Sequence, residues 1–294
     1  MSDDPRLGAR PPRRVSRELR PEGTVVDLGR GVLLGGPEVA VMAGPCAVEG
    51  RTQILEIAEA VRAAGATVLR GGAFKPRTSP YSFQGLGVRG LELLAEARAA
   101  TGMPVVTEAV DTESVPIVAE HADMIQVGAR NMQNFGLLRR VGRTGKPVLL
   151  KRGMGATIDE LLLAAEYFLA EGSEAVALCE RGVRGFDPAA PHLLDLNAIP
   201  LLRTLTHLPL VADPSHGTGV RAHVAPMARA AVAAGADGII VEVHTNPSEA
   251  RSDGAQSIYP GQLRELVSEC GAVARAVGRS LAPPRSAPAA VAGP

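Results

Sequence analysis

The sequence has no tryptophan, and aromatic residues make up only 3% of its 294 residues. It contains three cysteines, Cys46, Cys179 and Cys270, an odd number spread far apart along the chain. A disulfide framework is therefore not expected, and reduced thiols are. The chain also lacks net charge, because 31 cationic residues balance 31 acidic ones. Without a basic excess, neither nucleic acid nor an anionic membrane is an expected partner.

Long apolar runs are missing as well. No segment approaches the roughly 18 consecutive apolar residues of a membrane span, and the first residues lack the apolar segment of a secretory signal. We therefore expect a cytoplasmic protein. Lysine is scarce too: Lys75, Lys146 and Lys151 are the only lysines among the 31 cationic residues. Hydrophobic residues, at 46%, still allow a large buried core.

Eight short apolar segments alternate with amphipathic stretches that have helical spacing. The segments are EVAVMAG, ATVLRGG, MPVVTEA, ADMIQVGA, KPVLLKRG, EAVALCERG, LPLVADPSHG and DGIIVEVH. They lack strict alternation, as expected of parallel strands that are buried on both faces. This pattern predicts a (β/α)8 barrel, in the TIM-barrel class of α/β folds. The first segment is followed by GPCAVEG rather than GxGxxG, so a dinucleotide-binding sheet is not favoured.

The segments outside this repeat divide the rest of the chain. Residues 23–37, GTVVDLGRGVLLGGP, predict a β-hairpin that closes the amino-terminal end of a barrel over residues 38–279. Residues 1–22 and 280–294 are rich in proline, alanine or arginine and lack apolar periodicity. We expect both to be disordered, as an arm and a tail.

Charged residues follow almost every predicted strand, where barrels of this type carry their chemistry. One group is cationic and predicts a site for a small, multiply charged anion such as a phosphorylated carboxylate. It consists of Arg70, Lys75, Arg77, Arg130, Lys151 and Arg181. Any one of these residues could instead be a solvated loop residue, and Glu108 could be a structural partner for the cations. His121, His192, His207 and His223 are interpreted as surface or loop residues.

The second group combines one thiol, one imidazole and two carboxylates: Cys46, His216, Glu242 and Asp253. They follow the first, seventh and eighth segments, and the first and eighth strands are neighbours in a closed barrel. The mixed ligand set suits Mn²⁺, Fe²⁺, Zn²⁺ or Co²⁺ better than Mg²⁺. Cys46 alone could equally be a small buried hydrophobic residue.

Several motifs together resemble the 3-deoxy-D-arabino-heptulosonate-7-phosphate (DAHP) synthase family, in its branch with compact barrels. They are AGPCAVEG, LRGGAFKPRTSPYSFQGLG, IQVGARNMQN, VLLKRGM, LCERGVR, DPSHGTG and IIVEVH with a following SDGAQS. The related octulosonate-8-phosphate synthases have an Asn-containing segment where this chain reads KPRTS. The resemblance therefore favours the heptulosonate enzyme, which condenses phosphoenolpyruvate with erythrose 4-phosphate in the first step of the shikimate pathway.

The resemblance also implies a role for each site residue. It assigns the metal to Cys46, His216, Glu242 and Asp253, and the phosphoenolpyruvate carboxylate to Arg70, Lys75 and Lys151. It assigns the phosphate of that substrate to Arg130 and Arg181, and erythrose 4-phosphate to Lys75, Pro76, Arg77, Thr78 and Ser79. The residues interpreted as catalytic are Lys75, Lys151, Glu108 and His216. Either Lys151 or Glu108 would move the proton of the attacking water.

Two alternative functions remain open at this stage. One is a sibling sugar-acid synthase that uses another phosphorylated aldose, and the other is a catalytically silent barrel that acts as a partner protein. Relatives in this branch often carry a sensor domain for aromatic products, and too few residues precede the hairpin here to form one. We therefore expect a bare barrel that aromatic products do not inhibit. We also expect a homo-oligomer (dimer or tetramer), with a separate chorismate mutase as a possible regulatory partner.

Overall fold

The computed structural model describes residues 14–75, 79 and 81–284. Eight parallel strands close into a barrel, because β10 pairs with both β9 and β3. The strands are β3 (Glu38–Gly44), β4 (Val68–Arg70), β5 (Val105–Glu108), β6 (Met124–Val127), β7 (Val148–Lys151), β8 (Val176–Glu180), β9 (Leu210–Ala212) and β10 (Gly238–Glu242). Each lies within one of the eight apolar segments, so the predicted (β/α)8 barrel is confirmed.

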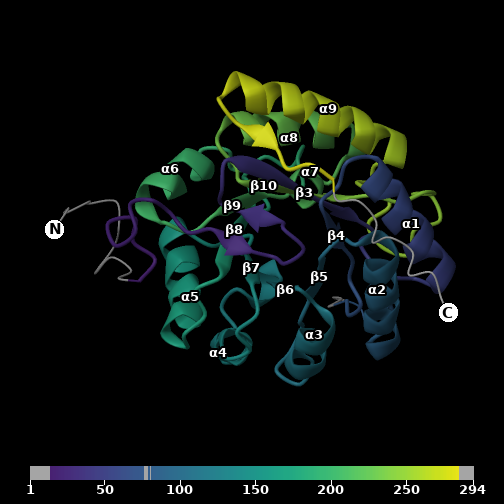
Figure 1. The fold of residues 1–294 in the computed structure, drawn as a ribbon, viewed down its shortest axis with the longest axis horizontal. Helices are drawn as coiled ribbons and strands as arrows, with labels where there is room; N and C mark the ends of the chain where they lie inside the picture. Colours follow the sequence, from purple (N-terminus) through teal and green to yellow (C-terminus); the bar gives the residue numbers. More distant parts are fainter. Residues whose placement is uncertain (1–13, 76–78, 80, 285–294) are drawn as a thin grey trace, which may run out of the picture.

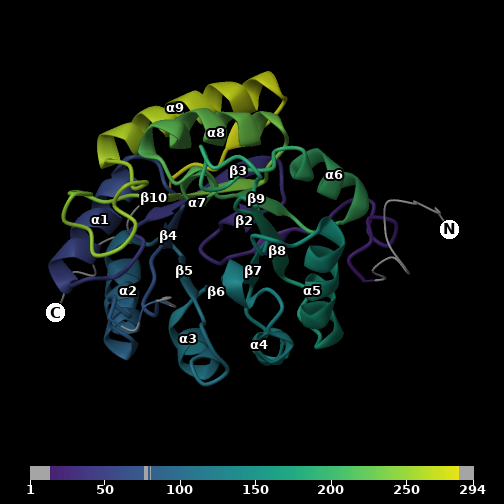
Figure 2. The same cartoon turned by 180° about the vertical axis from the view of Figure 1, so that it is seen from behind.

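The helices surround the barrel, as Figure 1 shows, and Figure 2 shows the same ring from behind. They are α1 (Arg51–Ala63), α2 (Val88–Thr101), α3 (Val115–His121), α4 (Phe135–Gly142), α5 (Ile158–Ala170), α6 (Ala198–Leu205), α7 (Pro214–Thr218), α8 (Arg221–Ala233) and α9 (Pro260–Ala276), with a 3-10 turn η1 (Ala129–Asn131). No helix in the described part of the chain is long and apolar enough to cross a membrane.

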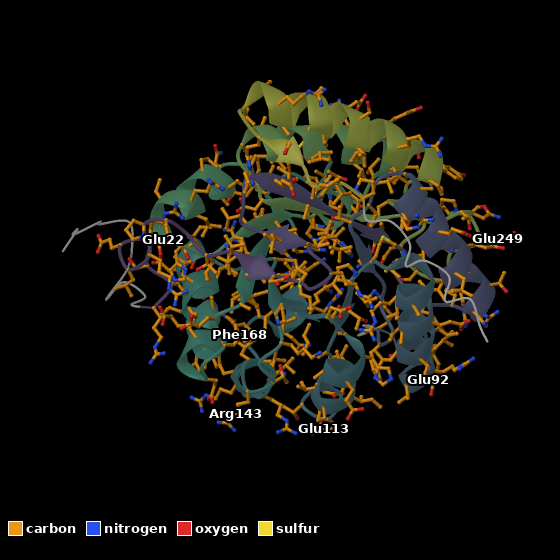
Figure 3. The ribbon with its side chains drawn as sticks, in the orientation of Figure 1. Glu22, Glu92, Glu113, Arg143, Phe168 and Glu249 are labelled. Atoms are coloured by element: carbon orange, nitrogen blue, oxygen red, sulfur yellow. The ribbon has the colours of Figure 1, made fainter. Side chains whose placement is uncertain are left out.

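Alternating side chains of each strand face two separate apolar layers. In β3, Val39, Val41 and Ala43 belong to the layer between the barrel and the helices, whereas Ala40 and Met42 belong to the layer inside the barrel. The outer layer also buries Phe168 of α5 completely. In Figure 3, Glu92, Glu113 and Arg143 lie at the periphery of the molecule. This two-sided burial explains why the strand segments are almost wholly apolar.

The predicted hairpin is present and fills one end of the barrel. β1 (Val26–Asp27) pairs antiparallel with β2 (Leu33–Leu34). Val26, Leu28, Val32 and Leu34 are buried in the same cluster as the inward-facing residues of the strands. The end of the barrel that holds the amino termini of the strands is therefore closed by aliphatic side chains.

Parts of the predicted arm and tail are ordered, so the expected disorder does not hold for residues 14–22 or 280–284. Val15 is fully buried, Ser16 forms an antiparallel bridge with Thr206, and Arg20 pairs with Glu174 at 2.7 Å. β11 (Ser280–Leu281) pairs in parallel with Glu38 and Val39, at the start of β3. These segments lack periodicity because each buries a single apolar side chain, Val15 in the arm and Ala282 in the tail.

Candidate active site

A cavity of about 540 Å³ opens where the strands end, on the side opposite the hairpin. Most of the predicted cations and proton-carrying groups line it. They are Arg70, Lys75, Ser79, Glu108, Arg130, Lys151, Arg181, His216 and Asp253. Of the other predicted substrate contacts, Pro76, Arg77 and Thr78 lie outside the described residues.

The four predicted metal ligands converge beside this cavity. Because Glu242 pairs in register with Gly44, the ends of β3 and β10 lie next to each other. Single ligand atoms of Cys46, Glu242 and Asp253 all lie within 4.8 Å of one another. His216 adjoins this group, with its Nε2 3.3 Å from Oε1 of Glu242. The four side chains therefore occupy positions from which they could share one divalent cation.

The protonation of this cluster depends on burial and on its charges. Burial and the Glu242 charge raise the pKa of the Cys46 thiol to about 12, so the thiol keeps its proton and hydrogen-bonds Oδ2 of Asp253 at 2.8 Å. Burial alone would raise the pKa of Glu242, but the charges of His216 and Arg70 lower it. A thiol, an imidazole and two carboxylates fit a borderline divalent cation, whose binding would displace the thiol proton.

Asp213 is a central residue to which the sequence analysis gave no role. Its Oδ2 accepts hydrogen bonds from Nζ of Lys151 at 2.5 Å and from Nδ1 of His216 at 2.7 Å. Burial would raise the pKa of Asp213, but the charges of His216 and Lys151 hold it well below its usual range. The carboxylate thereby turns Nε2 of His216 towards Glu242, as outer carboxylates do for metal-binding histidines. The sequence feature that could have identified Asp213 was its position in Asp-Pro-Ser-His, where it also caps α7.

Two guanidinium nitrogens of residues that line the cavity have no hydrogen-bond partner among the described residues. They are Nε of Arg70 and Nη1 of Arg181, and both are buried. Another nitrogen of Arg70 does have partners, since Nη1 donates to Oε1 of Glu242 at 3.0 Å and to the Pro45 carbonyl at 2.9 Å. A buried donor without a partner costs about 1–3 kcal/mol. An anion in the cavity would attract both guanidinium groups, and turning these nitrogens towards it would remove that cost.

The Glu108 carboxylate lines the cavity and lies close to the backbone at the end of the neighbouring strand, β6. Its Oε2 accepts a hydrogen bond from Nε2 of Gln126 at 2.9 Å. A Cβ atom at Gly128 would lie 2.2 Å from Oε1 of Glu108. The absence of a side chain at Gly128 therefore allows this carboxylate its position.

Changing Gly128 to alanine should displace Glu108 and lower the kcat of a reaction in the cavity, with a loss of about 1–3 kcal/mol in unfolding free energy from overpacking. Gly155→Ala is the matched control, because a Cβ there meets no atom within 4 Å. Steady-state kinetics and thermal unfolding of both variants check the prediction. Equal kcat in the two variants would mean that the Glu108 position does not matter for turnover.

Not every charge at a strand end serves the cavity. Arg152 pairs instead with Glu180 at 2.9 Å and with Asp195 at 3.0 Å, which anchors the loop between β8 and α6. That loop carries His192, a loop residue as interpreted from the sequence, and it lines the cavity. His207 also lies in a loop, but it is buried near the hairpin rather than at the surface, hydrogen-bonded to Thr24.

Comparisons with known proteins agree on one family. The model of the DAHP synthetase I family matches residues 23–277. A phospho-2-dehydro-3-deoxyheptonate aldolase from Thermotoga maritima is 53% identical over 269 residues, covering 92% of this chain and 79% of the relative. A 2-dehydro-3-deoxyphosphooctonate aldolase from Nitratidesulfovibrio vulgaris is 36% identical over 252 residues, covering 79% of this chain and 91% of the relative.

Two solved structures from Thermotoga maritima share the fold. The crystal structure of its DAHP synthase superposes with a TM-score of 0.90 at 52% identity, covering 94% of this chain and 80% of that one. A truncated form of the 3-deoxy-D-arabino-heptulosonate 7-phosphate synthase gives a TM-score of 0.86 at 49% identity, covering 92% of this chain and 98% of that one.

Proposed function

From the premise that this chain belongs to the DAHP synthetase I family, we propose that it condenses phosphoenolpyruvate with erythrose 4-phosphate and water. The products are 3-deoxy-D-arabino-heptulosonate 7-phosphate and inorganic phosphate, and the reaction begins the shikimate pathway. The chain is thus a 3-deoxy-7-phosphoheptulonate synthase, a transferase. The observation that carries the proposal within this molecule is the pair of unpartnered guanidinium nitrogens, on Arg70 and Arg181, in a cavity beside a thiol–imidazole–carboxylate cluster.

Phosphoenolpyruvate carries a carboxylate and a phosphate, and the cavity offers cations for both. We assign its carboxylate to Arg70, Lys75 and Lys151, all of which line the cavity. We assign its phosphate to Arg130 and Arg181, whose guanidinium groups can donate two hydrogen bonds to one phosphate. Erythrose 4-phosphate is assigned to the segment from Lys75 to Ser79. Placing both reactants in one cavity supplies much of the acceleration, because the enol carbon is a weak nucleophile.

The metal is assigned to Cys46, His216, Glu242 and Asp253, with Mn²⁺, Fe²⁺, Co²⁺ or Zn²⁺ as candidates. When bound, such an ion supplies Lewis acidity towards the aldehyde oxygen. When C3 of phosphoenolpyruvate attacks the aldehyde carbon, C2 becomes electron-poor and water adds to it. Phosphate then departs by cleavage of the bond between C2 and the phosphate oxygen. Arg130 and Arg181 stabilise the leaving phosphate.

Glu108 is the better candidate for handling the proton of the attacking water. Its Oε1 accepts no hydrogen bond from a described residue, and the carboxylate lines the cavity. Lys151, by contrast, is tied at 2.5 Å to the Asp213 carboxylate. The Lys151 ammonium group is therefore already engaged, and we assign Lys151, Lys75 and His216 to positioning the reactants.

Phosphate release from phosphoenolpyruvate, measured with each of three aldoses, tests the proposal. Erythrose 4-phosphate should be preferred to arabinose 5-phosphate and ribose 5-phosphate by at least about tenfold in kcat/KM. Chelation should abolish release, and added Mn²⁺ or Co²⁺ should restore it. A preference for arabinose 5-phosphate would support the sibling synthase, as the 36% identical octonate relative allows. Release with none of the aldoses would support the silent barrel.

Other expectations stay predictions. They are the homo-oligomer, the separate chorismate mutase partner, the insensitivity to aromatic products and the cytoplasmic location.

A further inference from the structure

The loop that carries Asp253 has an unusual backbone. It runs from the end of β10 to the start of α9, and Asp253 has φ of 54°. This left-handed conformation costs an L-residue roughly 1–2 kcal/mol. The next residue, Gly254, has its α-carbon so close to Pro247 that a Cβ would lie 2.1 Å from the Pro247 carbonyl oxygen. Contacts from outside the loop add to hydrogen bonds within it, such as the one from Oγ of Ser252 to Oδ2 of Asp253 at 3.0 Å.

Arg221, the first residue of α8, makes those contacts. Its backbone N–H donates to the Ala255 carbonyl at 3.2 Å. Its side chain donates from Nη2 to the Gly254 carbonyl at 2.8 Å and from Nε to the Ser257 carbonyl at 2.5 Å. The guanidinium group also lies over the ring of Tyr259, 5.0 Å from its centre. One residue thus fixes three carbonyls directly after Asp253.

The charge of Arg221 has no acidic partner to explain it. No carboxylate among the described residues forms an ion pair with Arg221. Two of its guanidinium nitrogens instead donate to backbone oxygens, a geometry that a lysine cannot reproduce. The consequence falls on Asp253, whose own carbonyl accepts a hydrogen bond from Oγ of Ser257 at 3.0 Å. Ser257 in turn is held by Arg221.

We propose that Arg221 is a positioning residue for the metal site: by clamping residues 254–257 it keeps the Asp253 carboxylate within reach of Cys46 and Glu242. This inference rests on the proposed metal role of Asp253. Without the clamp, Asp253 can relax to an ordinary φ, and its carboxylate turns away from the other ligands. The metal should then bind more weakly while the barrel itself stays folded.

The test compares Arg221→Met with Arg279→Met in the full chain. Arg279 is the control because it also donates to backbone carbonyls, those of Gly36 and Ala236, at the opposite end of the barrel. It additionally pairs with Asp237 at 3.0 Å, so its replacement is expected to cost stability but not metal affinity. Mn²⁺ affinity is measured by calorimetry, and the charge-transfer absorption between Co²⁺ and the Cys46 thiolate reports on the ligand set. Thermal unfolding of the metal-free proteins reports on stability.

Arg221→Met should raise the Kd for Mn²⁺ by about 10- to 100-fold and alter the Co²⁺ band, as loss of outer contacts does at other metal sites. Arg279→Met should leave both at wild-type values. Arg221→Lys, which keeps the charge with fewer donors, should fall between. If Arg221→Met does not fold, Arg221→Lys and Tyr259→Leu provide the same comparison. Wild-type Mn²⁺ affinity in a folded Arg221 variant would overturn the inference alone, whereas absence of binding to the unaltered protein would overturn the metal assignment.

Discussion

Replacement of Cys46 by alanine should abolish tight metal binding and lower phosphate release by about 10³-fold or more. The thiol is the one soft ligand in the cluster, 2.8 Å from Asp253, and its loss leaves only imidazole and carboxylate donors. A Lewis acid contributes several kcal/mol to stabilising the transition state, and about 4 kcal/mol corresponds to a factor of 10³ in rate. Phosphate release at saturating Mn²⁺ and metal content after dialysis measure the two effects.

Cys270→Ala is the control for this substitution. Cys270 is fully buried in the apolar layer between α9 and the barrel, so its replacement removes the same atom from a position outside the ligand cluster. It should lower the unfolding temperature slightly and leave metal and activity unchanged. Full activity in a Cys46→Ala protein stripped of metal would refute the assigned ligand set.

The pH dependence of Mn²⁺ binding gives a second measure of the same ligand. Because the pKa of Cys46 is raised to about 12, the thiol is protonated in the metal-free protein near neutral pH. Binding must then release that proton, so Kd should fall about tenfold for each unit of pH between about 8 and 9, where ordinary histidines are already neutral. Cys46→Ala should lack this slope.

The second large effect is expected from Asp213→Asn. Lys151 and Asp213 are both almost fully buried, and removing one partner of a buried ion pair costs about 3–5 kcal/mol. The same change frees the imidazole of His216, whose Nδ1 would lose its carboxylate acceptor. We therefore expect a markedly lower unfolding free energy together with weaker Mn²⁺ binding. Denaturant unfolding and calorimetry check the two parts.

The loss of stability should itself depend on pH. The pKa of Asp213 is depressed in the folded protein, so its contribution is fully present above the unfolded value of about 3.9 and disappears as the pH falls through the folded value. The difference between Asp213→Asn and the unaltered protein should therefore be constant near neutral pH and shrink in acid. Asp195→Asn is the control, since Arg152 would keep Glu180 as a partner. Equal losses in both variants at neutral pH would contradict the central position of Asp213.

The barrel could be predicted from the sequence because its strands are buried on both faces. β7, with Val148 to Leu150 fully buried, has no polar position before Lys151, and β5 and β6 have only one uncharged polar residue each, Thr107 and Gln126. The charged residue that follows each run could then be assigned to one end of the barrel. The residues proposed as metal ligands also converge for this reason, since β3 and β10 are neighbours in any closed barrel of this order.

What the sequence could not provide is the pairing among these charges. Whether Lys151 contacts Asp213 or Glu180 depends on the direction of side chains across three strand ends, and periodicity carries no such information. The same applies to His192, which reaches the cavity on a loop without a repeat pattern. Short ordered segments such as that around Val15 were missed because one buried side chain leaves no periodic signal.

The hairpin makes the two ends of this barrel evolve under different constraints. At its closed end, Val26, Val32 and Leu34 contribute only shape and volume, so other aliphatic residues of similar size could replace them at small cost. At the open end, buried charges such as Lys151 and Asp213 are paired, and a change at one of them is tolerated only with a compensating change at its partner. Sequence drift should therefore be gradual at the closed end and correlated between positions at the open one.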